Sequence, residues 1–140
     1  MKLRLMDAVP DRLSAGPGLS EWLDTHLLEM LETEFRCSRP CILMPRWAKA
    51  AGFTGLDISE RRLRLPAANM SAGHSTLVAI GAKVAQEVWK HTWGDLMMAG
   101  PEQGGPPRTF WWNDTEIVQE CVEFGTTWTI TTLTATKPRR

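Results

Sequence analysis

The chain has 140 residues, of which 43% are hydrophobic and 23% charged, and its 16 basic and 16 acidic residues give a formal net charge of zero. This composition excludes disordered and fibrous proteins, and the length suits one domain that buries a core without a disulfide or a metal. Apolar runs stay far below the roughly 18 residues that cross a bilayer, and the first residues lack a signal-peptide pattern. We therefore expect a soluble, cytoplasmic protein, with one globular domain over residues 1–136 and a basic tail over 137–140.

The three cysteines do not form the even, regularly spaced set of a disulfide framework, which agrees with a reducing compartment. Cys37 and Cys41 are loosely spaced for zinc, and the chain has no second cysteine pair to complete a site. We predict free thiols, no bound metal and no cofactor.

The N-terminal third predicts a strand followed by a helix. Residues 2–6 alternate polar and apolar side chains, as a short strand does, and residues 7–18 predict a loop because they hold two prolines and two glycines. Ser20 is a suitable N-cap, and apolar residues then recur every three or four positions, so an amphipathic helix is expected over residues 20–35. Those apolar residues are Trp22, Leu23, Leu27, Met30 and Leu31.

The middle of the chain is harder to assign. Pro40 ends the first helix, and a short second helix is expected over residues 45–51, because Pro45 suits a first helical turn and Gly52 suits the position after a helix. The apolar residues of segment 57–65 fit neither the helical nor the strand period, and we favour a helix there.

A long helix is predicted over residues 75–97. Ser75 would cap it, and the residues of its expected buried stripe are Leu77, Ile80, Val84, Val88 and Trp89. Residues 66–73 before it predict a loop, and residues 100–107 after it predict a turn-rich connector.

The C-terminal third predicts sheet. Residues 109–112 and 128–136 are rich in the aromatic and β-branched side chains that favour strands. We favour a strand also for residues 116–124, as the middle of a meander, with a short helix as the alternative. The fold class expected is therefore α+β: a small single domain with one long and one medium helix packed on a C-terminal antiparallel sheet.

Charges are distributed in blocks along the chain. Residues 13–35 hold five acidic residues and no Lys or Arg, residues 36–64 hold seven basic and two acidic residues, and residues 96–125 hold five acidic residues and one Arg. Such blocks can create a dipolar surface that orients a charged partner, unless they neutralise each other in the fold.

Residues 47–63 resemble a helix-turn-helix motif. Ala48 would let the two helices approach, Gly52 would take the turn, and Thr54 would cap the second helix, whereas Gly55 and Asp57 depart from the pattern. The resemblance implies DNA binding, and the basic residues that could contact nucleic acid or an acidic partner are Arg46, Lys49, Arg61, Arg62 and Arg64. The alternative is an ordinary connection between elements.

Tryptophan is unusually frequent, with seven copies beside four Phe and no Tyr. Trp is enriched in interaction hot spots, although a core can also use it. Adjacent residues of a strand point to opposite faces, so we expect at least one Trp of the C-terminal region to be exposed beside acidic side chains. The predicted interface consists of Trp93, Trp111, Trp112, Asp114 and Glu116.

The sequence has no phosphate-binding glycine loop and no recognised nucleophile or metalloprotease motif. The favoured function is therefore a non-enzymatic binding protein that acts by protein–protein contact, an inhibitor or adaptor of the kind that mobile genetic elements or phages encode. The alternative is a helix-turn-helix DNA-binding regulator using residues 47–64, and a third is a Cys- or metal-dependent enzyme. A membrane partner is not expected, and the oligomeric state is left open.

Overall fold

The computed structural model of the chain describes residues 1–12, 14–57, 62–68, 76–98 and 109–139. Within these residues the fold is α+β, as predicted, with helices packed around a four-stranded antiparallel sheet. In this part of the chain, none of the helices is both long and apolar enough to cross a membrane.

The C-terminal strand β4 (Thr127–Thr136) is the centre of the sheet. Strand β1 (Lys2–Met6) pairs with one edge of β4, and β2 (Thr54–Asp57) and β3 (Arg62–Pro66) pair in succession with its other edge. The register sets Leu3 opposite Leu133 and Leu63 opposite Ile130. The strands predicted near the N-terminus and the C-terminus of the chain are therefore both present. Strand β4 pairs with segments that lie far apart in the sequence.

A continuous helical run follows the first loop. It consists of α1 (Pro17–Leu23), a π-helical segment η1 (Asp24–Leu28) and α2 (Glu29–Thr33). The run begins three residues before the predicted Ser20, because Pro17 occupies the first turn. Its fully buried stripe has one leucine every four residues, Leu19, Leu23, Leu27 and Leu31, which the wide turn of η1 helps to keep on one side.

Helix α3 (Pro40–Ala50) begins five residues before the predicted start at Pro45, which lies inside the helix. Pro40 takes the first turn, and the carboxylate of Asp7 accepts a hydrogen bond from the Cys41 amide at 2.9 Å, which satisfies one of the free amides of that turn. Gly52 follows the helix with a φ of +85°, in the role expected for it.

The helix favoured for residues 57–65 is wrong. Thr54–Asp57 and Arg62–Pro66 are strands that pair with β4, and residues 58–61 lie outside the described part of the chain. The second helix that the helix-turn-helix resemblance implies is therefore not present: the residues described at each end of that segment form strands. Pairing with a long central strand decides this segment, because its local period favours neither structure.

The long helix is present as α4 (Thr76–Trp89), a π-helical segment η2 (Lys90–Gly94) and α5 (Asp95–Met98); Ser75, its expected cap, lies outside the described residues. Its buried face differs from the predicted stripe, of which Trp89 is buried and Val88 half-buried whereas Leu77, Ile80 and Val84 are exposed. The residues that are buried instead are Ala82, Ala85, Trp89, Trp93 and Met97.

Two strand predictions in the C-terminal third are also wrong. Trp111–Asn113 is a 3₁₀ turn, η3, and Thr115–Phe124 is a helix, α6, so the alternative of a helix is the correct one. The Asp114 side chain accepts hydrogen bonds from the amides of Glu116 and Ile117, and Gly125 ends the helix in the left-handed conformation. These two caps fix a helix in a segment that buries Ile117 and Cys121 on one side.

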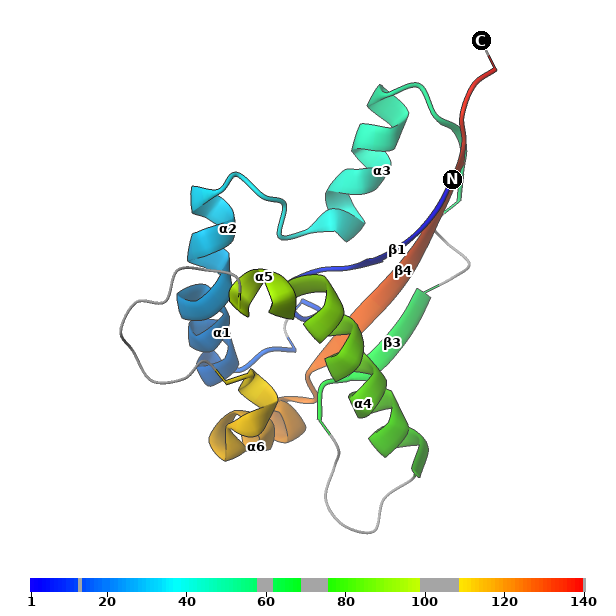
Figure 1. Cartoon of the computed structure of the whole chain (residues 1–140). Coiled ribbons are helices and arrows are strands. Elements are labelled where there is room, and N and C mark those ends of the chain that lie inside the picture. Colours follow the sequence, from blue (N-terminus) through cyan, green and yellow to red (C-terminus); the bar gives the residue numbers. More distant parts are fainter. Residues whose placement is uncertain (13, 58–61, 69–75, 99–108, 140) are drawn as a thin grey trace.

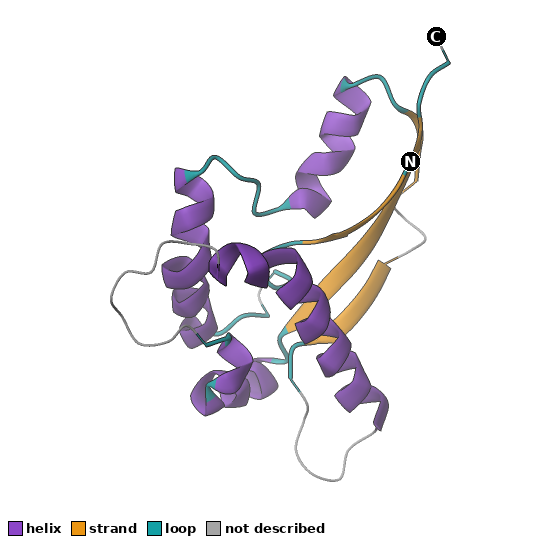
Figure 2. Ribbon diagram, in the orientation of Figure 1, coloured by secondary structure: helices purple, strands orange, loops and turns teal. Residues whose placement is uncertain are grey.

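The main core lies at the end of the sheet where β4 begins. Helices α1, α2, α5 and α6 gather around this end, and the two termini lie at the opposite end (Figure 1). In Figure 2, α3 lies beside the upper part of the strands and α4 beside their lower part. Trp89, Trp111 and Trp128 are among the largest fully buried side chains, so the tryptophan-rich cluster is the centre of the fold.

Candidate functional site

A polar cleft of about 640 Å³ lies between the loop after β1, the start of α3 and the β3–β4 pair. Its lining includes Asp7, Asp11, Arg12, Cys41 and Arg64. A second cavity shares Asp7, Asp11 and Arg12 with it and extends the cleft toward α1 and η1. The cleft therefore brings carboxylates, guanidinium groups and a thiol together from three distant parts of the sequence.

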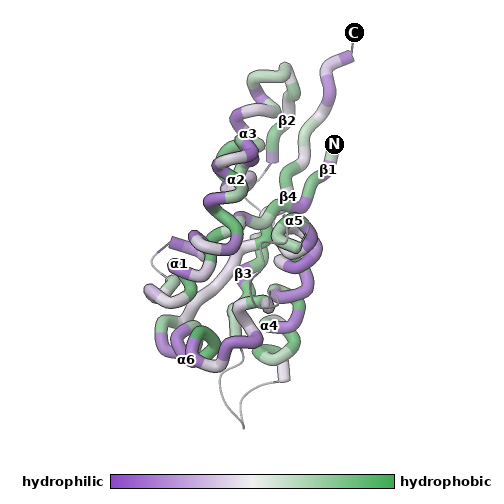
Figure 3. Tube along the Cα trace, turned by 60° about the vertical axis from the view of Figure 1, so that its left-hand side comes forward, coloured by the Kyte–Doolittle hydropathy of each residue, from purple (hydrophilic) through white to green (hydrophobic). Residues whose placement is uncertain are grey.

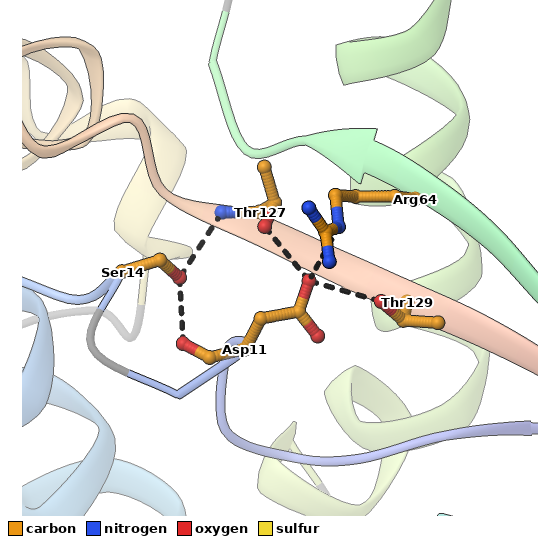
Figure 4. Close-up of polar contacts among 5 residues, drawn as sticks. All are labelled: Asp11, Ser14, Arg64, Thr127 and Thr129. Carbon is orange, nitrogen blue, oxygen red and sulfur yellow. Dashed lines mark hydrogen bonds and ion pairs between the residues drawn. The ribbon is translucent and has the colours of Figure 1, made fainter.

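The carboxylate of Asp11 is the best-connected group in this cleft. Its Oδ2 accepts hydrogen bonds from the hydroxyls of Thr127 and Thr129 at 2.7 and 2.9 Å, and Arg64 Nε lies 3.8 Å from the same oxygen. Ser14 adds a second link, because its hydroxyl donates to the Asp11 carbonyl oxygen and accepts from the Thr127 amide, as Figure 4 shows. These contacts hold the loop after β1 against β4, so Asp11 has a structural task.

The Cys41 thiol lies beside the Asp7 carboxylate. Burial and the negative charge of Asp7 together raise the pKa of Cys41 to about 11, although a hydrogen bond from Thr131 opposes the rise. Burial also raises the pKa of Asp7. The reactive form of cysteine is the thiolate, and the raised pKa keeps Cys41 in the protonated form at neutral pH. Among the described residues, no group of three His, Cys, Asp or Glu side chains is placed to hold a metal ion.

The outer face of α3 carries an exposed tryptophan. All seven tryptophans are described, and Trp47 has an exposed fraction of 51%, whereas the other six are buried or half-buried. With about 100° per residue in a helix, Arg46 lies at the middle of the exposed face, Trp47 on one side of it, and Ile42 and Lys49 on the other. We call Ile42, Arg46, Trp47 and Lys49 the α3 face.

The exposed side of α4 carries an apolar stripe. Leu77, Ile80 and Val84 have exposed fractions of 78%, 53% and 39%. Beside Val84, a groove of about 400 Å³ separates α4 from the sheet, and its lining includes Val88, Leu63 and Ile130. We call Leu77, Ile80 and Val84 the α4 stripe. It consists of residues that the helical period had predicted to be buried.

Trp93 and Trp111, two residues of the predicted interface, are buried in the core, so neither provides the exposed indole that was expected. The expected exposure of one Trp from an adjacent pair on a strand fails because Trp111 and Trp112 belong to the η3 turn. Trp111 stacks on Trp128 with ring centroids 5.2 Å apart, and the half-buried Trp112 stacks on Phe110 at 4.5 Å.

The two acidic residues of that predicted interface lie at the start of α6. Asp114 uses its side chain to cap the helix, and Glu116 is exposed in the first turn. With Trp111 buried and Trp112 packed against Phe110, they do not border an exposed indole. A side chain that caps a helix is also a poor contact residue, because an intermolecular contact would compete with the cap.

Four of the five predicted basic residues are divided between α3 and β3. Arg46 and Lys49 are exposed on the α3 face, and Arg64 is exposed on β3 at the cleft. Arg62 belongs to β3 at the position opposite Thr131, and Arg61 lies outside the described residues. The predicted interface did not include Trp47. Its place in the sequence, between Arg46 and the alanines at 48, 50 and 51, was a usable signal of a residue outside the core.

Comparisons of the chain with protein-family models, with curated proteins and with solved structures find no significant match. The functional argument therefore depends on the surfaces described above.

Proposed function

We propose that this chain is a non-enzymatic binding protein that acts by protein–protein contact through the α3 face. The observation that carries the proposal is the exposure of Trp47, at 51%, in a molecule that packs its other six tryptophans into or against the core. A large aromatic side chain left in water loses the free energy that burial would provide, so its exposure on a well-formed helix favours a role in contact.

The surroundings of Trp47 have the arrangement of an interaction hot spot. Small exposed residues, Ala50 and Ala51, follow it on the helix, and the charged side chains of Arg46 and Lys49 lie on the adjacent surface. An apolar anchor bordered by charged groups is typical of the centre and rim of a protein interface. The α3 face therefore suits a partner with a surface pocket that receives the indole ring of Trp47.

The charge of the α3 face indicates the chemistry of that partner. Arg39 is exposed at the start of α3, and Arg46 and Lys49 follow on the outer face, so a protein surface with acidic groups would be complementary to it. An inhibitor or adaptor that occupies an acidic surface fits this arrangement, and a cytoplasmic location belongs to the same proposal. DNA recognition by a second helix is not part of it, because the described parts of that segment, Thr54–Asp57 and Arg62–Pro66, are strands.

The test is quantitative affinity capture from the source cell with three tagged proteins: wild type, Trp47→Ala and Phe124→Ala. Phe124 is also 51% exposed, but it lies on α6, so it is a matched control. We expect Trp47→Ala to leave the melting temperature unchanged and to weaken the partner's affinity by about 2 kcal/mol, and Phe124→Ala to bind like wild type.

The purified chain should be tested with random duplex DNA in parallel. Tight binding to the duplex that falls steeply with salt would replace the protein partner by nucleic acid. Equal capture by wild type and Trp47→Ala would show that the α3 face is not the contact surface.

A further inference from the structure

The α4 stripe leaves a contiguous apolar surface in water. Ile80 and Val84 are one helical turn apart, and Leu63 of β3, exposed at 54%, lies across the groove that Val84 lines. Figure 3 shows the first turns of α4 as a hydrophobic segment, and Figure 1 shows this end of the helix directed away from the other helices. Contiguous apolar patches on a monomer often mark interaction sites.

Lys83 and Glu87 border the stripe, and Glu87 Oε2 also lies 4.0 Å from His91 Nε2. Lys83 Nζ lies 3.4 Å from Glu87 Oε1, one turn further along α4, and both side chains are substantially exposed. If two such helices pack antiparallel about a twofold axis near this turn, Lys83 of each copy faces Glu87 of the other. Val84 then packs against Val84 and Ile80 of the other copy, so that the same patch on each copy forms the contact.

The overall charge also permits contact between two copies. The chain has 16 basic and 16 acidic residues and a formal net charge of zero, so two copies do not repel each other as strongly charged proteins do. The groove beside the stripe has Arg4 on its lining, and the helix beside it carries Lys83 and Glu87. This mixture of signs fits a neutral partner better than an anionic membrane surface.

We propose that two copies of this chain form a twofold-symmetric dimer in which the α4 helices pack antiparallel through Ile80 and Val84. Leu63 lies at the margin of this interface, and Lys83 and Glu87 form ion pairs between the copies. The interface is separate from the α3 face: Thr131 of β4 contacts Cys41 of α3, whereas its neighbour Ile130 lines the groove with Val84 of α4. Adjacent strand residues point to opposite faces, so the two surfaces lie on opposite sides of the sheet.

The first experiment measures the mass of the purified chain by sedimentation velocity over a wide concentration range. We expect a monomer–dimer equilibrium for wild type, and an increase in the dissociation constant of at least about tenfold for Ile80→Glu and for Val84→Glu. Phe124→Glu, which changes an equally exposed apolar residue outside α4, should dimerise like wild type. Circular dichroism and melting temperature check that each variant is folded.

The second experiment exchanges the charges of the rim. Lys83→Glu and Glu87→Lys should each weaken the dimer, because each places like charges opposite one another. An equimolar mixture of the two variants should restore association as a heterodimer. A wild-type chain that stays monomeric at every concentration overturns the proposal. A dimer that is insensitive to Ile80→Glu, or a mixture that fails to associate, overturns it as well. None of these measurements involves the partner of the α3 face.

Discussion

Most of the tryptophans are buried, and they stabilise the core in different ways. The indole N–H groups of Trp89 and Trp128 donate to the carbonyl oxygens of Ala8 and Asp7, at 3.2 and 3.1 Å. Both bonds hold the segment that leaves β1. The buried indole N–H groups of Trp93 and Trp111 have no hydrogen-bond partner among the described residues, so these two rings contribute by packing.

A matched pair of substitutions separates these two tasks. Trp111 and Trp128 are both fully buried and stack on each other, so Trp→Phe removes a similar volume at each position. We expect Trp128→Phe to lower the free energy of unfolding by about 1 kcal/mol more than Trp111→Phe, because it leaves the Asp7 carbonyl oxygen without its donor. Urea unfolding measures the difference. Equal losses would show that the hydrogen bond adds nothing to stability.

At the scale of elements, one carboxylate joins the first and the last helix. The Glu120 side chain on α6 accepts hydrogen bonds from the amides of Gly18 and Leu19, at 2.8 and 2.9 Å, in the first turn of α1. A helix start has unpaired amides and a partial positive charge, and a carboxylate satisfies both. Gly16 allows this approach, because a Cβ there would lie 2.3 Å from the Glu120 carboxyl carbon.

The substitution Glu120→Ala tests this link between helices. We expect it to lower the free energy of unfolding by about 1 to 2 kcal/mol, since the amides of α1 lose their acceptor. Glu123→Ala, on the exposed part of the same helix, should change it by less than about 0.5 kcal/mol. Urea unfolding of the double variant Gly16→Ala/Glu120→Ala, compared with each single variant, provides a check. If Gly16→Ala destabilises the chain equally with and without Glu120, the close contact is not what requires glycine.

For the molecule as a whole, the half-buried thiol of Cys41 and the buried thiol of Cys121 couple folding to alkaline pH. Burial raises the pKa of Cys41 and of Cys121 from 9.0 to about 11. For Cys121, a hydrogen bond from Thr126 opposes this rise, and the nearby Glu120 carboxylate contributes to it. Both thiols therefore keep their protons in the folded chain at pH values where the unfolded chain begins to lose them.

This coupling predicts the direction of the pH dependence. Because the folded pKa is above the unfolded one, the stabilisation is fully present below pH 9 and is lost as the pH rises toward about 11. The free energy of unfolding should fall across this interval, and Cys121→Ala should reduce the slope. The chain has no tyrosine to titrate there. Urea unfolding followed by tryptophan fluorescence at several pH values measures the slopes, and an unchanged slope for Cys121→Ala would contradict the prediction.

The sequence by itself determined the features that depend on neighbouring residues. The alternation in Lys2–Met6, the β-branched run that becomes β4, and the apolar recurrence of the two long helical segments all predicted the correct elements. The capping residues Asp114 and Gly125 were also present in the sequence as signals of α6, but the β-rich surroundings led to a strand prediction there. Local period and local capping are properties of a short segment, so they can be read without the fold.

Only the tertiary structure decided which surfaces meet. The α4 stripe faces water because the helix approaches the sheet through Gly81, where a Cβ would lie 3.2 Å from the Pro66 side chain. Trp89, Trp93 and Met97 anchor another side of the helical run in the core. Thr54–Asp57 and Arg62–Pro66 become strands because β4 offers them an edge. The exposure of Trp47 and the burial of Trp93 and Trp111 have the same cause: burial depends on contacts between residues far apart in the chain, and the hydropathy of one segment does not contain them.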